Sequence, residues 1–480
     1  MPPDISTEFR EESRIVFDLS RIVKAYDVRG TVPDQFDESV ARAIGAAFVQ
    51  TLRAAGDNVD RVVTAHDMRE SSPGLASAFA EGITSQGVDV VAAGLGSTDM
   101  LYYAAGALDL PGAMFTASHN PAQYNGIKMC RKGAKPIGQD TGLSEIRQRA
   151  QAILDGKAEL APSGVKPGSV EKRDLLGDYA AYLRKLVDLS GIRPLSVVVD
   201  AGNGMGGYTV PAVLGDSYLP TLPLRITPLY FELDGSFPNH EANPLEAKNI
   251  VDLQAAVREH GADLGIAFDG DADRCFVVDE NGAAVTPSAI TALVAVRELA
   301  KDPGSTVIHN LITSHAVPEI VAEHGGVPVR TRVGHSFIKA EMASTGAIFG
   351  GEHSAHYYFR DFWGADTGML AAMHVLAALG GSQKPLSELA AEYNRYPASG
   401  EINSTVADQH GKLAEVERHY AAVPGVTIDK LDGLTVGFPD GSWANLRPSN
   451  TEPLLRLNVE AAEPKRMAAL RDEVLTLVRG

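Results

Sequence analysis

The sequence predicts an α/β protein that is divided into several domains, and three observations support this. Short apolar runs typical of strands alternate with amphipathic stretches typical of helices from about residue 61 onward. The chain has 480 residues, which is too long for one ordinary core and indicates roughly three or four domains. The last part differs, because Leu454–Val459 alternates like a half-exposed strand and Glu463-Pro464 introduces a closing helix.

The first predicted strand and helix lie at Arg61–Ala65 and after Ser72-Pro73. The serine is a suitable N-cap, and proline is favoured in the first helical position. Leu75, Phe79 and Ile83 follow at four-residue spacing, which predicts the buried face of this helix. Further apolar runs predict strands at Val88–Ala92, Gly112–Phe115, Leu195–Asp200, Leu264–Phe268 and Thr306–His309.

Composition and charge exclude several classes of protein. With 44% hydrophobic and 22% charged residues, the chain is typical of soluble globular proteins. A net charge of −18 argues against nucleic acid or an anionic membrane as partner. Residues 1–12 lack the apolar core of a signal peptide, and no stretch approaches the roughly 20 apolar residues of a membrane span. Two cysteines indicate reduced thiols, so we expect a cytoplasmic protein.

Three aspartates alternate directly after a predicted apolar strand: Asp269, Asp271 and Asp273. Such a fan of hard oxygen ligands suits a small divalent cation such as Mg²⁺. The spacing also fits positions 1, 3 and 5 of an EF-hand, with Glu280 at position 12. However, Arg274 stands where that loop needs glycine, and a strand replaces the preceding helix. A solvated acidic turn also stays open at this point.

A second polar loop, Thr116–Pro121, follows another apolar strand and carries Ser118. A lone serine is more often a turn residue than a nucleophile. Here Asn120-Pro121 and Asn125-Gly126 impose turns, which predicts a stiff, exposed loop. A serine hydroxyl in such a loop can carry a covalent group. A metal site facing a nucleophilic hydroxyl suggests phosphoryl transfer.

Two further polar loops contain groups suited to a phosphosugar. Glu352, Ser354 and His356 alternate along an extended segment, so they can converge on vicinal hydroxyls of a sugar ring. The last loop combines a guanidinium, two hydroxyls and an amide within five residues, which makes a competent clamp for a phosphate dianion. Its members are Arg447, Ser449, Asn450 and Thr451.

Taken together and in this order, the four loops resemble those of the α-D-phosphohexomutase superfamily, in particular its phosphomannomutase/phosphoglucomutase branch. The resemblance runs from Lys24 to Arg456. It implies three similar mixed-sheet α/β domains and a smaller C-terminal α+β domain around a central cleft. With candidate linkers near 165–170, 281–285 and 397–401, we expect domains at 1–168, 169–283, 284–398 and 399–480. They would carry the phosphoserine, metal-binding, sugar-binding and phosphate-binding loops, respectively.

The resemblance also implies roles for individual residues. Ser118 is expected to carry the phosphoryl group and, through it, to join the three aspartates around Mg²⁺. Lys128 is expected as general acid/base, provided that its pKa is lowered; Arg29 and His335 are the other expected catalytic residues. The expected substrate-binding residues are Tyr26, Arg274, Gly334, Glu352, Ser354, His356, Arg447, Ser449, Asn450 and Thr451.

The implied activity is an intramolecular phosphotransferase that interconverts hexose 6-phosphate and hexose 1-phosphate through hexose 1,6-bisphosphate. Asn450 and the Ser354-Ala355-His356 segment are most similar to phosphomannomutases, so mannose is expected first and glucose also. The partner is then a small phosphosugar, and the enzyme a monomer or homodimer. A phosphoglucosamine mutase, a Mg²⁺-dependent sugar phosphatase with an aspartyl nucleophile and a non-catalytic calcium-binding protein remain as alternatives.

Two further polar segments are His309–Ser314 and Asp67–Ser72. Some family members carry a substrate-binding lysine after the first strand of the third domain, whereas this chain has His309–Ser314 there. A second segment contains Asp67, Arg69, Ser71 and Ser72. We interpret it as structural support for the phosphoserine loop, and we interpret His119 as loop support as well.

Overall fold

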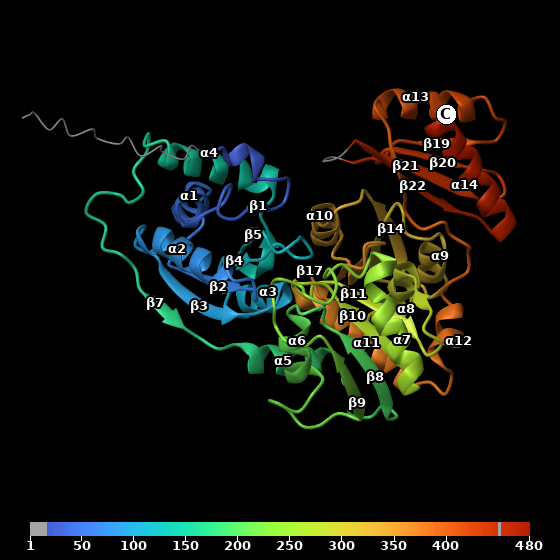
Figure 1. The fold of residues 1–480 in the computed structure, drawn as a ribbon, viewed down its shortest axis with the longest axis horizontal. Coiled ribbons are helices and arrows are strands. Elements are labelled where there is room, and N and C mark those ends of the chain that lie inside the picture. The colour runs from blue at the N-terminus through green and yellow to red at the C-terminus, as the bar shows by residue number, and fades with distance from the viewer. Residues whose placement is uncertain (1–16, 450–452) are drawn as a thin grey trace, which may run out of the picture.

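The computed structural model describes residues 17–449 and 453–480, which form four domains (Figure 1). Domains I, II and III each combine a mixed sheet with covering helices, and domain IV combines an antiparallel sheet with two helices. The predicted fold class is therefore confirmed. In Figure 1, domain IV lies at one end of the molecule, beyond α9 and α10 of domain III.

Domain I contains a sheet with the order β1-β5-β4-β2-β3-β7, and β6 pairs with β5. Strands β4, β2, β3 and β7 are parallel, whereas β5 is antiparallel to β1 and β4. The strands are β1 (Val28–Thr31), β2 (Arg61–His66), β3 (Asp89–Leu95), β4 (Gly112–Phe115), β5 (Tyr124–Arg131), β6 (Lys135–Pro136) and β7 (Val170–Lys172). The helices are α1 (Glu38–Ala54), α2 (Ser72–Thr84), α3 (Thr98–Ala107) and α4 (Leu143–Leu154).

Domain II has a sheet of order β12-β11-β10-β8-β9, in which β10, β8 and β9 are parallel. Its strands are β8 (Leu195–Asp200), β9 (Leu224–Leu229), β10 (Leu264–Phe268), β11 (Cys275–Asp279) and β12 (Ala284–Val285). Its helices are α5 (Leu176–Leu186), α6 (Gly206–Val213) and α7 (Val251–His260).

Domain III repeats this arrangement with the order β14-β13-β15-β16-β17. Its strands are β13 (Thr306–Asn310), β14 (Val327–Thr331), β15 (Phe349–Gly351), β16 (Tyr357–Phe359) and β17 (Ala365–Asp366). Its helices are α8 (Pro287–Lys301), α9 (Ala316–Glu323), α10 (His335–Thr345), α11 (Gly368–Gly380) and α12 (Leu386–Ala391).

Domain IV forms an antiparallel sheet of order β18-β22-β21-β20-β19 around its own hydrophobic core. Strand β22 lies inside this sheet, and all its residues from Leu457 to Glu460 are buried, so the expected half-exposed pattern is wrong there. The strands are β18 (Ile402–Thr405), β19 (Thr427–Asp429), β20 (Leu434–Gly437), β21 (Trp443–Pro448) and β22 (Leu454–Glu460). The helices are α13 (Gln409–Ala421) and the expected closing helix α14 (Pro464–Arg479).

One structural device recurs in domains I, II and III. In each sheet, a parallel strand is followed by a short polar loop and then by an antiparallel neighbour: β4 to β5, β10 to β11, and β15 to β16. The carboxyl ends of parallel strands are the usual ligand-binding edge of an α/β sheet. The Ser118, aspartate and Glu352 loops occupy these three equivalent places.

The start of α2 corrects one prediction. The N-cap is Ser71, not Ser72. The Ser72 hydroxyl instead donates to Asp67 Oδ1 at 2.5 Å, because a buried carboxylate competes for it. The predicted apolar face of the helix is confirmed by the burial of Leu75, Phe79 and Ile83.

Domains I, II and III are joined by shared packing and by a buried carboxylate. One hydrophobic cluster contains side chains from all three domains. Asp99 at the start of α3 accepts hydrogen bonds from Tyr179 of α5 and Thr367 before α11, both at 2.7 Å. Because Asp99 is buried, these contacts hold three domains at one point. The three polar loops are therefore held in fixed relative positions.

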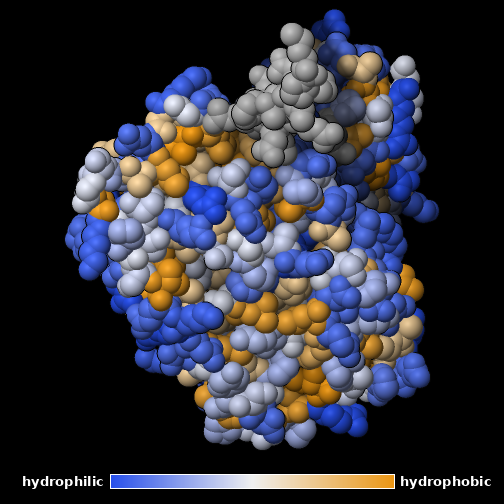
Figure 2. All heavy atoms as spheres, turned by 60° about the vertical axis from the view of Figure 1, so that its left-hand side comes forward, coloured by the Kyte–Doolittle hydropathy of each residue, from blue (hydrophilic) through white to orange (hydrophobic). Residues whose placement is uncertain are grey.

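Figure 2 shows hydrophilic residues over much of the face turned to the viewer, with smaller apolar patches between them. Such scattered apolar residues are ordinary on protein surfaces. Among the described residues, no helix is long and apolar enough to cross a membrane.

Candidate active site

Ser118 lies directly beyond β4 and points toward domain II. We call residues 116–124 the Ser118 loop. Its backbone is left-handed at Ser118 (φ 50°), and the Ser118 N–H donates to Thr116 Oγ1 at 2.9 Å. Its hydroxyl donates to Asp269 Oδ2 at 3.0 Å and lies 3.2 Å from His119 Nδ1. The nucleophile candidate and the acidic loop therefore meet although they come from different domains.

The three predicted metal ligands form one buried cluster. Carboxylate oxygens of Asp269, Asp271 and Asp273 lie within 4.8 Å of one another. Lys128 of β5 bridges two of them, with Nζ 2.7 Å from Asp271 Oδ2 and 2.6 Å from Asp273 Oδ2. Arg274 Nε donates to Asp269 Oδ2 at 2.9 Å. Two cations thus compensate part of the negative charge.

Burial and neighbouring charges shift these groups in different directions. Burial raises the pKa of Asp269 to about 7, with Arg274 opposing this shift and the other aspartates adding to it. Burial also acts to raise the pKa of Asp271, but Lys128 outweighs it and holds that pKa below its ordinary value. Burial acts to lower the pKa of Lys128, but Asp271 and Asp273 raise it well above its ordinary value. In this arrangement Lys128 is a cation, not a base.

The cluster fits a divalent cation. Asp271 Oδ1 and Asp273 Oδ1 are buried, and neither has a hydrogen-bond partner among the described residues. Buried carboxylate oxygens without partners are costly, and a hard cation would satisfy them. The flanking elements β10 and β11 are strands, so the helix–loop–helix frame of an EF-hand is absent from this part of the structure.

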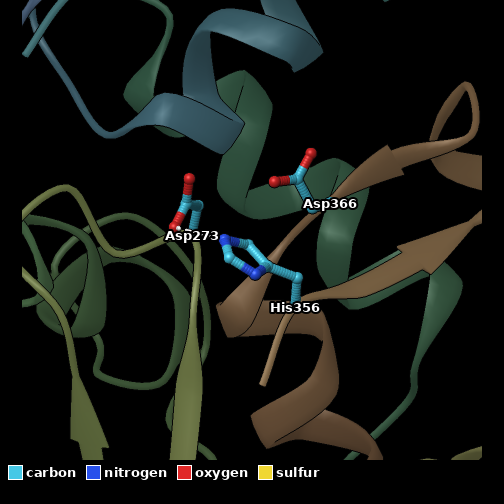
Figure 3. A group of neighbouring side chains, drawn as sticks. All are labelled: Asp273, His356 and Asp366. Atoms are coloured by element: carbon cyan, nitrogen blue, oxygen red, sulfur yellow. Dashed lines mark ion pairs between the residues drawn. The ribbon is translucent and has the colours of Figure 1, made fainter. Parts of the chain in front are cut away.

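His356 of the Glu352 loop contacts the aspartate loop of domain II (Figure 3). The imidazole lies near two carboxylates: its Nε2 is 3.7 Å from Asp273 Oδ1, and ligand atoms of Asp273, His356 and Asp366 lie within 4.8 Å of one another. Its Nδ1 is 2.9 Å from Ser354 Oγ. Asp366 is paired with Lys339 Nζ at 2.5 Å, which holds the pKa of Asp366 below its ordinary value although burial opposes this.

Glu352 is buried at the carboxyl end of β15, where backbone and side-chain donors orient its carboxylate. Its Oε1 accepts from Gly334 N at 3.1 Å, and its Oε2 accepts from Tyr358 Oη at 2.7 Å. Asn310 Nδ2 lies 3.4 Å from Oε1. Asn310 therefore reaches the Glu352 loop from the segment at residues 309–314. His309 beside it is buried, which lowers its pKa to about 4.

Tyr26 and His335 bring domain I into contact with domain III. Their rings meet edge to face, with centroids 4.6 Å apart. Burial lowers the pKa of His335 to about 4, so this imidazole is neutral at neutral pH. Arg29 donates to Asn120 Oδ1 at 2.6 Å and to Asp27 Oδ2 at 2.6 Å, which places its guanidinium beside the Ser118 loop.

The candidate phosphate clamp is described only in part. Arg447 lies at the end of β21, and its Nη1 is buried without a hydrogen-bond partner among the described residues. Its Nη2 is 3.5 Å from Glu401 Oε2. Ser449 is nine-tenths buried, and its N–H donates to the Leu454 carbonyl at 2.8 Å. The predicted clamp residues Asn450 and Thr451 lie outside the described residues.

Three residues at the site were missed by the sequence analysis. Thr98 Oγ1 donates to Asp271 Oδ2 at 2.6 Å, and Lys339 and Asp366 form the ion pair beside His356. Lys339 could have been found, because it follows His335 by four residues and so lies one helical turn along α10. Thr98 and Asp366 carry no such local signal.

Comparison with known proteins gives matches over nearly the whole chain. Family profiles of phosphoglucomutase/phosphomannomutase match in four segments: α/β/α domain I at residues 20–156, domain II at 177–282, domain III at 286–396 and the C-terminal domain at 401–477. The order of the four segments is that of the four domains in the structure.

Individual relatives agree with these profiles. A protein of Xanthomonas campestris pv. campestris named as phosphohexose mutases is 41% identical over 461 residues, which cover 95% of this chain and 99% of the relative. A phosphomannomutase of Vibrio cholerae is 39% identical over 461 residues (95% and 97%). The crystal structure of a phosphoglucomutase/phosphomannomutase family protein from Burkholderia thailandensis superposes with a TM-score of 0.83 at 33% identity, covering 96% of this chain and 98% of that one.

Proposed function

We propose that this chain, which belongs to the phosphoglucomutase/phosphomannomutase family and is thus a hexose phosphate mutase, works through phospho-Ser118. The observation that carries this proposal is the position of the Ser118 hydroxyl, 3.0 Å from Asp269 in a cluster of three buried carboxylates. A phosphoryl group on this oxygen would lie against the cluster. A divalent cation held there can neutralise its charge.

The reaction has two half-steps. In the first, the free hydroxyl of a hexose phosphate attacks phosphorus; the Ser118 Oγ–P bond breaks, a sugar O–P bond forms, and the hydroxyl proton passes to a base. The product is hexose 1,6-bisphosphate. After this intermediate turns end for end, Ser118 Oγ takes its other phosphoryl group and the freed sugar oxygen regains a proton. Phosphate and proton are thus conserved over one cycle.

We assign three roles to the residues near Ser118: binding of the cation, proton transfer and contact with the phosphoryl group. Asp269, Asp271 and Asp273 would hold Mg²⁺, which supplies positive charge to the phosphoryl oxygens. Lys128 remains our candidate proton carrier. It shares the carboxylates of Asp271 and Asp273 with the cation that would bind there, so its raised pKa belongs to the arrangement without metal. Arg29, which contacts Asn120 of the Ser118 loop, would bind the phosphoryl group.

The remaining residues would hold the sugar and its second phosphate. Glu352, Ser354 and His356 would bind hydroxyls at C3 and C4. Tyr26, Arg274 and Gly334 would add further substrate contacts, and His335 would be a further catalytic residue. Arg447, Ser449, Asn450 and Thr451 would bind the distal phosphate, and the unpaired Arg447 Nη1 supports this. The phosphosugar would be bound in the cytoplasm by a monomer or homodimer.

Peptide mapping of phosphate tests this mechanism directly. The protein should carry phosphate on the peptide that contains Ser118, either as purified or after incubation with glucose 1,6-bisphosphate. Ser118→Ala should abolish both labelling and turnover. A label on an aspartyl carboxylate instead would indicate a phosphatase, and full activity without any phosphate on this peptide would exclude the serine mechanism.

The choice of sugar needs a separate assay. Mannose and glucose differ only at C2, so a grip on C3 and C4 cannot separate them strongly. We therefore propose that mannose 1-phosphate and glucose 1-phosphate are used within about tenfold in kcat/KM, or about 1.4 kcal/mol. Glucosamine phosphates should be poor substrates. A side-by-side assay in which glucosamine 6-phosphate is strongly preferred would overturn this choice but not the phosphoserine mechanism.

A further inference from the structure

Arg69 forms a dense set of polar contacts behind the Ser118 loop. It follows β2 in domain I, and only 2% of its surface is exposed. Its Nη1 donates to the carbonyls of Pro121 at 2.9 Å and Tyr124 at 3.0 Å. Its Nη2 donates to the carbonyls of Ser118 at 2.9 Å and Asn120 at 2.7 Å. One side chain thus holds four carbonyl oxygens of this loop.

Asp67 completes the coordination of this guanidinium. Arg69 Nε donates to Asp67 Oδ2 at 3.2 Å, so all five N–H groups of the guanidinium are used. Asp67 is fully buried and also accepts from Ser72 Oγ at 2.5 Å. The ion pair is neutral as a whole, and its geometry leaves Arg69 one defined position. A lysine could not reproduce this planar set of donors.

Domain II covers the other side of Arg69. The ring of Phe237 lies 5.1 Å from the guanidinium carbon, a cation–π contact. The backbone at Gly235 approaches so closely that a Cβ there would lie 2.8 Å from Arg69 Cα. Domain II also carries the metal loop. Arg69 therefore fixes the Ser118 loop relative to the domain that holds the aspartates.

The conformation of Ser118 requires such a support. A left-handed backbone is strained for a residue other than glycine and persists only where its surroundings impose it. We propose that Arg69 is a positioning residue: it holds the carbonyls of the Ser118 loop, and thereby keeps Ser118 Oγ directed at Asp269 for phosphoryl transfer. This inference rests on the proposed function of Ser118. Since the sugar and phosphate clamps belong to domains III and IV, the loss of Arg69 should slow the chemical step without weakening substrate binding.

The test compares Arg69→Lys with a matched control, Arg184→Lys. Arg184 of α5 also donates to three carbonyls, those of Val213, Gly215 and Pro220, but within domain II and away from the site. We expect kcat to fall about 100-fold in Arg69→Lys, as for a misplacement of about 1 Å, with KM within about threefold. Arg184→Lys should keep the wild-type kcat even if its melting temperature falls as much as that of Arg69→Lys.

Several outcomes would overturn the inference. These are a wild-type kcat in Arg69→Lys, a rise in KM that accounts for its whole loss of kcat/KM, or an equal loss of kcat in Arg184→Lys. If Arg69→Lys does not fold, Phe237→Leu decides, because it removes the aromatic contact through which Arg69 holds the Ser118 loop against domain II. That variant should lower kcat about threefold at constant KM, and an unchanged kcat contradicts the inference.

Failure of the proposed function is recognised separately. The phosphorylation state of wild-type Ser118 is measured in the same experiment by intact mass and peptide mapping. A wild-type enzyme that turns over without phosphate at Ser118 rejects the serine mechanism. A wild-type phosphoenzyme together with an unimpaired Arg69→Lys variant rejects only the role of Arg69.

Discussion

Replacement of Gly270 by alanine should separate the two loops of the active site and slow turnover. Gly270 follows the first metal-ligand candidate, and its Cα faces the backbone of Ser118. A Cβ at this position would lie 2.4 Å from the Ser118 carbonyl oxygen, about 1 Å closer than the 3.4 Å at which ordinary contact begins. The Gly270 carbonyl accepts from Met205 N at 2.9 Å, which limits its retreat into domain II.

The expected loss of kcat follows from the distance by which the two loops move apart. If the loops move apart by about 1 Å, the 3.0 Å hydrogen bond between Ser118 Oγ and Asp269 is lost. A misplacement of about 1 Å can cost about 100-fold in rate, or about 2.7 kcal/mol. We therefore expect kcat to fall about 100-fold in Gly270→Ala, while binding of the sugar phosphate, which domains III and IV provide, changes little.

The assay is steady-state kinetics with a coupled readout of hexose 6-phosphate, together with a thermal melt for each variant. Gly191→Ala is the control, because nothing lies within 4 Å of a Cβ at that exposed turn; its kinetics should equal those of the wild type. A folded Gly270→Ala enzyme with a kcat within twofold of the wild type would refute the reasoning. It would mean that the close approach of the two loops is not needed for transfer.

Three further predictions concern charge at the site and at a buried histidine. Asp271→Asn should weaken Mg²⁺ binding in a calorimetric titration and lower kcat more than about 100-fold, while the melting temperature changes little; wild-type affinity would contradict the metal assignment. Arg447→Lys should raise KM about tenfold and also lower kcat, because an ammonium cannot reproduce the planar fork; unchanged kinetics would place the clamp elsewhere. Burial lowers the pKa of His374 to about 4, whereas a histidine in the unfolded chain has a pKa of about 6.5. As the pH falls from about 6.5 to about 4, the unfolded state therefore binds a proton before the folded state does. The free energy of unfolding should fall by roughly 3 kcal/mol over this interval. Urea denaturation at several pH values should show that the free energy of unfolding depends less steeply on pH in His374→Asn than in the wild type. An equal dependence on pH would refute the lowered pKa.

The sequence predicted features that depend on neighbours along the chain. The burial of one helix face through Leu75, Phe79 and Ile83 follows from the helical repeat. The placement of Asp269, Asp271 and Asp273 beyond an apolar strand follows from the pattern of that strand. These features are local, because secondary structure and turn chemistry are decided within a few residues. The first serine of α2 was misassigned because its hydroxyl donates to the buried carboxylate of Asp67, and the burial of Asp67 is set by the folded structure.

By itself, then, the sequence determined the α/β class, the strand ends and the identity of the polar loops. Only the tertiary structure decided which groups act on one another. Lys128 meets Asp271 across 143 positions, Arg69 meets the Ser118 carbonyl across 49, and Asp366 pairs with Lys339 of a neighbouring helix. The strengths of ion pairs and the pKa values of buried groups depend on distances of a few ångströms and on exclusion of water. Those distances exist only once each domain has folded and, for Lys128 and Asp271, once domains I and II have packed together.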